Sequence, residues 1–171
     1  FNLHVSAFIE LITVAYQGIA KFEEISVTPK DVLGVWGDGN LGYITSLFLK
    51  ELCPDSEIIV FGKHVENLNL FSFADKIYLI HEVREDLKID HAFECVGSAA
   101  SQSAIEQMIE LINPQGTINL FGVSEYPIPI NTRMVLEKGL TLQGNSRSER
   151  EDFEGVVAIL QKNPQLFNYL S

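Results

Sequence analysis

The segment Asp31-Val-Leu-Gly-Val-Trp36, followed at once by Gly37-Asp-Gly39-Asn-Leu-Gly42, decides the fold of this chain. Its first half is almost entirely apolar, which is typical of a parallel strand buried on both faces. Its second half has the spacing G-x-G-x-x-G, and residues 41–52 then follow with the apolar periodicity of a helix. The motif is a weak signal by itself, but between a buried strand and a helix it favours a turn that binds a dinucleotide.

Each position of this turn has a separate physical role in that interpretation. Gly37 allows the sharp bend, Gly39 lets the backbone approach a pyrophosphate, and Gly42 lets the helix pack closely on the sheet. The phosphates are expected on free N–H groups of the first helical turn, at Asn40 and Leu41. The alternative is a glycine turn without a ligand in another doubly wound fold.

Outward from the turn, strand-like and helix-like patterns alternate along the whole chain. Strands are expected at 31–36, 57–61, 76–80, 89–94, 117–121 and 140–143. Helices are expected at 5–21, 41–52, 65–73, 101–112, 131–138 and 149–162, with Ser101 capping the fourth. This alternation predicts an α/β protein with a Rossmann doubly wound parallel sheet of six strands, in the order 3-2-1-4-5-6, with helices on both faces. We expect a connecting helix over 1–29, a nucleotide-binding domain over 30–171, and a cofactor crevice beyond strands one and four.

Composition limits the classes of function. The chain has 171 residues, of which 46% are hydrophobic and 20% charged, as in globular proteins. Its net charge is -11 and it has no basic tract, so we expect no nucleic-acid partner. No apolar run has the length of a membrane span, so we expect no membrane partner. The two cysteines, Cys53 and Cys95, are too few for a structural zinc site and indicate a reducing, cytoplasmic compartment.

The end of the second expected strand bears on the choice between NAD and NADP. NAD sites usually place an Asp or Glu there, about 20 residues after the glycine motif, to bind the ribose hydroxyls. This chain has Gly62, Lys63 and His64 at that place, and no carboxylate. A cation suits the additional 2′-phosphate, so we predict an NADP(H) site in which Lys63, with His64, binds it. In the alternative interpretation both are ordinary surface residues.

Several strings of residues, taken together, resemble the medium-chain zinc-dependent dehydrogenases and reductases. The segment 7–16 is similar to the helix that joins the catalytic and cofactor domains in the polyol dehydrogenases of this family. The strings 36–43 (WGDGNLGY), 61–63 (FGK), 91–97 (HAFECVG) and 136–142 (LEKGLTL) resemble its ribulose-5-phosphate reductases, which serve CDP-ribitol and teichoic-acid or capsule synthesis. The resemblance covers essentially the whole chain and implies the cofactor-domain fragment of an enzyme.

That resemblance implies an NADPH-dependent oxidoreductase that converts a sugar phosphate, D-ribulose 5-phosphate, to D-ribitol 5-phosphate, with a catalytic zinc polarising the carbonyl. It also implies cofactor contacts after later strands, at Cys95, Val96, Gly97, Gly122, Val123, Ser124 and Arg147, although for Arg147 a surface arginine at a helix entry is the slightly favoured alternative. Glu10 is the residue that we carry over toward the zinc, either as a direct or water-bridged ligand or as a more distant residue. The family's cysteine and His-Glu ligands lie outside this chain. We therefore expect no catalytic residue in this fragment, and neither tight zinc binding nor turnover by it alone.

The sixth strand is expected at the edge of the sheet. There its apolar residues 140–142 could pair with a second copy of the chain and form a homodimer. The competing functions are another polyol or alcohol dehydrogenase of the same family, a dinucleotide sensor without enzymatic activity, and a methyltransferase. Glu10 argues against the sensor, and the missing acid after the second strand argues against the methyltransferase.

Overall fold

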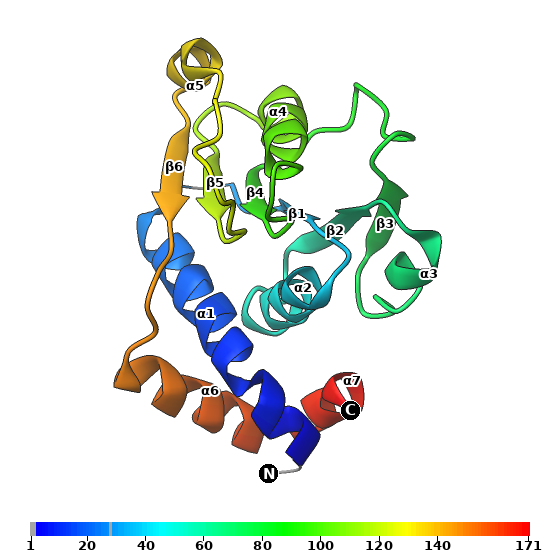
Figure 1. Ribbon diagram of the computed structural model, residues 1–171, viewed down its shortest axis with the longest axis vertical. Helices are drawn as coiled ribbons and strands as arrows, with labels where there is room; N and C mark the ends of the chain where they lie inside the picture. The colour runs from blue at the N-terminus through cyan, green and yellow to red at the C-terminus, as the bar shows by residue number, and fades with distance from the viewer. Residues whose placement is uncertain (1–2, 28) are drawn as a thin grey trace.

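The computed structural model describes residues 3–27 and 29–171, in which strands and helices alternate (Figure 1). The strands are β1 Val32–Trp36, β2 Glu57–Gly62, β3 Lys76–Leu79, β4 His91–Glu94, β5 Thr117–Leu120 and β6 Thr141–Gly144. The helices are α1 Leu3–Ile25, α2 Asn40–Leu52, α3 Val65–Leu68, α4 Ser101–Leu111, α5 Thr132–Lys138, α6 Arg150–Lys162 and α7 Phe167–Leu170, with a 3-10 turn, η1, at Pro164–Leu166.

The described strands form one sheet in the order β3-β2-β1-β4-β5-β6, which confirms the predicted topology. Every pair of neighbours is parallel. β1 and β4 are the neighbours at which the strand order reverses, and Trp36 at the end of β1 lies opposite Phe61 of β2 and Glu94 of β4. The loops that leave these three strands therefore emerge side by side at one edge of the sheet, where open α/β sheets bind ligands.

Helices cover both faces of the sheet (Figure 1). On one face α1, α2 and α6 enclose a core in which Phe22, Phe48 and Phe93 are fully buried. On the other face α4 and α5 cover a second core, in which Met108 packs with Trp36. The two cores explain why β1 and β2 are apolar on both sides, since neither face of these central strands meets water.

α1 is part of the same packing unit as the sheet. Its residues Ile12, Ile19 and Phe22 are fully buried in the core that also contains Leu33 of β1. The proposed division into a connecting segment 1–29 and a domain 30–171 therefore stays a prediction, and residues 1, 2 and 28 of that segment lie outside the described residues.

Two local predictions are wrong. The expected helix over 65–73 is only the single turn α3, because Phe71 and Phe73 turn inward and pack edge-on against Tyr43, each at 5.2 Å between ring centroids. The N-cap of α4 is Ala100 and not Ser101, whose hydroxyl donates elsewhere. The expected end of the last helix at residue 162 is confirmed, and η1 and α7 follow it.

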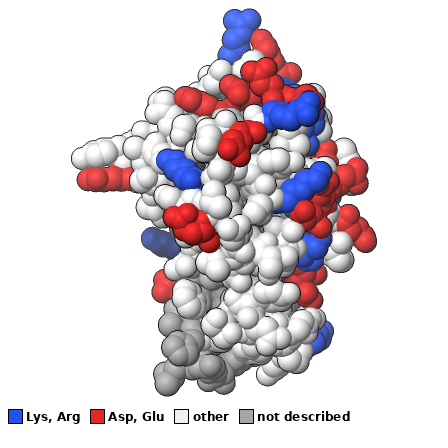
Figure 2. Space-filling model, turned by 90° about the vertical axis from the view of Figure 1, so that its right-hand side faces the viewer, with Lys and Arg blue, Asp and Glu red and all other residues white. Residues whose placement is uncertain are grey.

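The face on the β3 and α3 side of the molecule carries acidic and basic side chains next to one another, with a largely uncharged lower part (Figure 2). Exposed ion pairs such as Lys76 with Glu57 contribute to that mixture, with 2.8 Å between the amine and carboxylate. No helix in the described part of the chain combines the length and apolar character that a membrane crossing requires.

Candidate dinucleotide-binding site

The turn between β1 and α2 has the geometry that its glycines predict. Gly37 has φ +135°, which side chains disfavour, and a Cβ on Gly42 would collide with the Gly37 carbonyl oxygen. Gly39 is different, because a Cβ there would meet nothing within 4 Å. Gly39 is also the N-cap of α2 and has no side chain to satisfy the first amides of that helix. The turn thus presents unblocked N–H groups beside an open space, as a bound phosphate requires.

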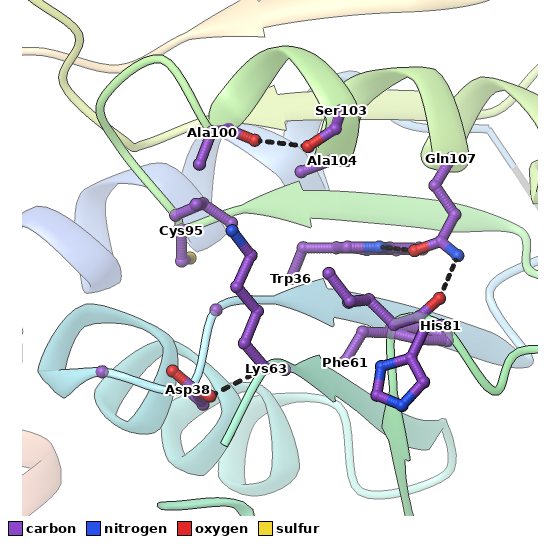
Figure 3. A pocket seen from close by; sticks show the side chains of 15 residues that line it. Trp36, Asp38, Phe61, Lys63, His81, Cys95, Ala100, Ser103, Ala104 and Gln107 are labelled. Carbon is purple, nitrogen blue, oxygen red and sulfur yellow. Dashed lines mark hydrogen bonds between the residues drawn. The ribbon is translucent and has the colours of Figure 1, made fainter.

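A pocket of about 430 Å³ opens beside this turn, at the carboxyl ends of β1, β2 and β4 (Figure 3). It brings together Gly37, Gly39, Gly62, Lys63, Cys95 and Val96 from the predicted set. The other wall is formed by α4, through Ala100, Ser103, Ala104 and Gln107. The pocket lies at the predicted crevice and between the strands at which the order reverses.

Trp36 forms the inner end of the pocket. Its indole stacks on Phe61 with 4.0 Å between ring centroids, and Phe61 in turn stacks on Tyr78 at 5.9 Å. The indole Nε1 donates to Gln107 Oε1 at 2.9 Å, and Gln107 Nε2 donates to the Ile80 carbonyl at 2.8 Å (Figure 3). These bonds fix the indole plane and give the pocket a rigid aromatic end.

A carboxylate from elsewhere in the chain lies at the end of β2, although residues 62–64 themselves carry none, as the sequence indicates. It belongs to Asp38 of the glycine turn, whose Oδ2 accepts from the backbone N–H groups of Lys63 at 2.8 Å and His64 at 2.7 Å. The His64 ring nitrogen Nδ1 is 3.1 Å from the same oxygen. Gly62 makes room for this side chain, because a Cβ there would lie 2.7 Å from Asp38 Cβ. In the sequence, the signal for this contact is Gly62, a glycine at the end of β2 that leaves space for the side chain of another residue.

The hydrogen bonds determine the charge of Asp38. Burial by itself raises the pKa of this carboxyl, but the N–H donors of His64 and Lys63 and the His64 ring outweigh it and lower the pKa overall. Asp38 is therefore ionised at neutral pH and shapes the loop that carries Lys63 and His64.

Lys63 and His64 differ in what their side chains contact. The His64 ring is engaged by Asp38, although 56% of its side chain is exposed. The Lys63 side chain extends across the mouth of the pocket toward Cys95 (Figure 3). Among the residues that the structure describes, no hydrogen bond or ion pair engages its amine. Lys63 is thus the cation at this pocket that remains available to an anionic group.

The predicted residues after β4 and β5 are organised by a residue that the sequence interpretation missed, Glu94. Its fully buried carboxylate accepts from the backbone of Val96, Gly97 and Gly122 and from the Ser101 hydroxyl, at 2.8 to 3.1 Å. In the sequence, the signal for this role of Glu94 is an acidic residue at the end of a largely apolar strand. Val123 is 86% exposed on the second of these loops, and the Ser124 hydroxyl donates to Tyr126 O at 2.9 Å.

Neither cysteine has the character of a reactive thiol. Cys95 lies against the pocket, and burial raises its pKa above the ordinary range, with its Sγ 3.6 Å from Thr45 Oγ1. Burial, and then the neighbouring Glu23 carboxylate, raise the pKa of Cys53 to about 12. Both thiols therefore stay protonated at neutral pH.

Arg147 and Glu10 lie away from this pocket. Arg147 has φ +58°, and its carbonyl accepts from Gln17 Nε2 at 2.7 Å. Glu10 is exposed on α1, and the described residues contain no group of three or more His, Cys, Asp and Glu side chains that could hold a metal. The metal role of Glu10 and the cofactor roles of the other predicted residues stay predictions.

The sheet order and the glycine turn after β1 define a Rossmann-type domain, and comparison with known proteins places it more narrowly. A family model for zinc-binding dehydrogenases matches residues 68–162, more than half of the chain. The chain belongs to this zinc-binding dehydrogenase family.

The chain is similar to proteins with more specific names. Over 99% of its length it is 52% identical to ribulose-5-phosphate reductase from Bacillus spizizenii and 50% identical to ribulose-5-phosphate reductase 1 from Staphylococcus aureus, and it spans 50% of the length of each. S. aureus TarJ, in its crystal structure in complex with NADPH, is 50% identical in sequence to this chain, and the two structures match with a TM-score of 0.94. The match covers 99% of this chain and 54% of the TarJ chain. Galactitol-1-phosphate dehydrogenase from Escherichia coli, at 18% identity and a TM-score of 0.73 over 91% of this chain and 49% of that one, shares the fold.

Proposed function

We propose that this chain is the NADPH-binding part of a zinc-dependent reductase that converts D-ribulose 5-phosphate to D-ribitol 5-phosphate. The observation that carries the proposal is the 52% and 50% identity, over 99% of the chain, to proteins named for this reaction. The open glycine turn and the unengaged amine of Lys63 support the cofactor part independently. Another polyol or alcohol dehydrogenase of the same family is the second candidate.

Three groups of residues fit the three parts of the cofactor: its pyrophosphate, its adenosine and its nicotinamide. The pyrophosphate binds the first amides of α2, at Asn40 and Leu41, where the absent side chain of Gly39 leaves space. The adenosine occupies the pocket that ends at Trp36, and Lys63 binds its 2′-phosphate. The loop after β4 then lies beside the adenosine ribose and the nicotinamide ribose, with Cys95, Val96 and Gly97 as its predicted contacts. The nicotinamide ring lies by Gly122, Val123 and Ser124 of the loop after β5.

The chemistry is the addition of hydride from NADPH and one proton to the substrate ketone. A zinc in the complete enzyme supplies a Lewis acid at the carbonyl oxygen. Glu10 is the residue of this chain that we assign to that metal, directly or through a water, and Arg147 is the residue that we assign to the cofactor near the sugar phosphate. We further propose that the protein is a cytoplasmic homodimer that pairs at the exposed edge of β6, where Leu142 is 37% exposed.

The cofactor assignment is tested by calorimetric titration of the 171-residue chain with NADPH and with NADH. We expect NADPH to bind at least about tenfold more tightly, which corresponds to about 1.4 kcal/mol. Equal affinities, or tighter binding of NADH, would contradict the NADPH assignment. Light scattering on the same sample tests the dimer, and Leu142→Lys should convert it to a monomer because like charges would then meet across the two-fold axis.

The reaction is tested in a hybrid enzyme. This chain replaces the matching half of the B. spizizenii reductase, and NADPH oxidation is followed with ribulose 5-phosphate and with unphosphorylated polyols and alcohols. Because the catalytic half of the hybrid comes from a ribulose-5-phosphate reductase, NADPH-dependent activity on ribulose 5-phosphate shows that this chain supports that reaction. Activity on another polyol alone supports the second candidate. Metal analysis of the hybrid and of its Glu10→Gln variant tests the zinc assignment, since loss of a ligand should lower the zinc content.

A further inference from the structure

The carboxylate of Glu94 is buried, and its two oxygens together accept four hydrogen bonds. Its side chain is at the end of β4, and the residue is 1% exposed. Oε1 accepts from Val96 N at 2.8 Å, Gly97 N at 3.1 Å and Ser101 Oγ at 2.8 Å. Oε2 accepts from Gly122 N at 3.1 Å. An ionised carboxylate suits this environment because it only accepts hydrogen bonds, and each donor here is an N–H or O–H.

These donors come from three different segments. Val96 and Gly97 belong to the loop after β4, Ser101 is the first residue of α4, and Gly122 belongs to the loop after β5. The two loops also contact one another, since Ser98 N donates to Val123 O at 2.8 Å. Glu94 therefore joins both loops to the helix that forms the far wall of the pocket.

The backbone is shaped around this carboxylate. Gly97 and Ser98 have φ of +76° and +59°, so two successive residues are in the left-handed region and wrap the loop over Glu94. A Cβ on Gly122 would lie 2.5 Å from both Glu94 Oε1 and Gly97 N. The two loops could not approach so closely without this glycine and this acceptor.

No cation compensates the charge among the hydrogen-bond partners of Glu94 that the structure gives. The compensation comes from backbone dipoles and from the N-terminus of α4, where the Ser101 hydroxyl donates. Because a neutral amide has one acceptor oxygen in place of two, its NH₂ group would face one set of these donors. If it faces Gly122 N, that donor keeps its 3.0 Å bond to the Glu94 carbonyl but meets a second donor in place of Oε2.

We propose that Glu94 is a positioning residue that fixes the loops after β4 and β5 on the nicotinamide side of the cofactor site, so that its loss affects this side more than the adenosine side. The inference rests on the proposed function, because it requires that the loops after β4 and β5 bind the nicotinamide half. The adenosine side is held by a separate set of contacts, those of Asp38 with the loop of Lys63 and His64. Glu94 reaches the adenosine pocket through Val96 and α4, which line it, but its described hydrogen bonds do not extend to Asp38, Lys63 or His64.

The experiment compares two ligands that share only the adenosine half. Adenosine 2′,5′-bisphosphate carries the 2′-phosphate and the 5′-phosphate but no nicotinamide, and NADPH carries both halves. Calorimetry on the 171-residue chain should show that Glu94→Gln lowers the affinity for NADPH by about tenfold to a hundredfold. This is the effect expected when buried donors lose a charged acceptor. The affinity for adenosine 2′,5′-bisphosphate should fall by less than about threefold, because Val96 and α4 line the pocket while the contacts of Asp38 with the Lys63 loop remain. An equal loss for both ligands, or unchanged NADPH binding, overturns the inference.

Asp90→Asn is the matched control. Asp90 is also a buried acid next to β4, but it lies at the opposite end and accepts from Asp31 N at 3.0 Å, Val32 N at 2.9 Å and Asn113 Nδ2 at 3.1 Å. This variant should lower thermal stability and affect both ligands alike. A loss for NADPH alone in Asp90→Asn would mean that the effect of Glu94 is not positional, which overturns the inference.

Ser101→Ala covers the case in which Glu94→Gln does not fold. It removes one donor to Oε1 and keeps the carboxylate, so the affinity for NADPH should fall by about threefold to tenfold and that for adenosine 2′,5′-bisphosphate by less than about twofold. An equal change for both ligands again overturns the inference. If the unaltered chain binds neither ligand, the proposed function itself fails, and the assignment of Glu94 fails with it. The two failures are thus distinguishable.

Discussion

The N-termini of α2 and α4 face the same edge of the sheet and follow the two central strands, β1 and β4, yet they are used in opposite ways. α2 is preceded by its N-cap Gly39, which has no side chain and has open space around it. α4 begins at Ser101, whose hydroxyl already donates to the buried Glu94 carboxylate of its own chain. The comparison teaches that a helix N-terminus attracts a ligand's anion only where the chain has not supplied an anion itself.

The largest expected effect separates the two roles of glycine at the start of α2. Gly42→Ala should lower the free energy of unfolding by about 3 kcal/mol or more, because its Cβ would collide with the Gly37 carbonyl. Gly39→Ala should leave stability within about 0.5 kcal/mol, since it has space and an extended backbone, with φ of -91°. It should nevertheless weaken NADPH about tenfold or more by blocking the approach of the pyrophosphate. Denaturant unfolding and calorimetry on both variants make the comparison, and unchanged NADPH binding by Gly39→Ala would argue against a phosphate at α2.

The next effect concerns the carboxylate that holds the Lys63 loop. Asp38→Asn should destabilise the chain by about 1–3 kcal/mol at neutral pH, because two backbone donors lose a charged acceptor. The pKa of Asp38 is lowered in the folded state, so its stabilisation is present above the unfolded value of about 3.9 and is lost as pH falls toward the folded value. Thermal unfolding between pH 7 and 3 should show a shallower acid loss in the variant. Asp75→Asn is the control. Partial burial raises the pKa of Asp75, but the Ile58 N–H and Lys50 outweigh it and lower the pKa overall, as happens for Asp38. Asp75 lies outside the pocket, so its replacement should leave the affinity for NADPH unchanged.

A smaller effect is expected at the cation. Lys63→Ala should weaken NADPH by about tenfold and leave NADH unchanged, because only NADPH carries the 2′-phosphate. The difference in NADPH affinity between the unaltered chain and Lys63→Ala should shrink in high salt, since Lys63 is exposed and its charge is screened. Calorimetry at two salt concentrations measures both. A parallel loss for NADH would show that Lys63 has no part in the discrimination.

The smallest effect lies at the far end of β4. His91 is 1% exposed, its Nδ1 accepts from Thr117 N, and its Nε2 lies 3.0 Å from the carbonyls of Val27 and Pro29. Burial lowers its pKa despite the two carbonyls, so the unfolded chain binds a proton below about pH 6.5 before the folded chain does. Stability should fall by at most about 1.4 kcal/mol per pH unit from there. His91→Gln should remove this slope, and the exposed His81→Gln should not; a flat wild-type profile between pH 7 and 5 would refute the assignment.

The sheet and the glycine turn could be predicted because their signals are local. Each central strand is an apolar run, and the three glycines stand within six residues of a strand end. The wrong and missing predictions involve contacts between distant residues. Asp38 supplies a carboxylate to amides 25 and 26 positions away, and a motif search examines only the residues at the end of β2.

Glu94 was missed for a related reason. Its partners are mostly backbone N–H groups, which have no letter in a sequence, and they become visible only when the loops after β4 and β5 are folded together. The same contact explains the error at Ser101, since a hydroxyl that donates to Glu94 is turned away from the capping role that its position suggested.

The position of Trp36 gives this chain an internal optical probe. It is the single tryptophan among the 171 residues, and it forms the inner end of the pocket with its plane fixed by Phe61 and Gln107. All indole emission therefore originates beside the pocket, and a reduced nicotinamide absorbs where indole emits. Binding of NADPH should quench this emission by energy transfer, while adenosine 2′,5′-bisphosphate lacks the acceptor. A single unlabelled sample can then report separately on whether the pocket is filled and whether the nicotinamide is present.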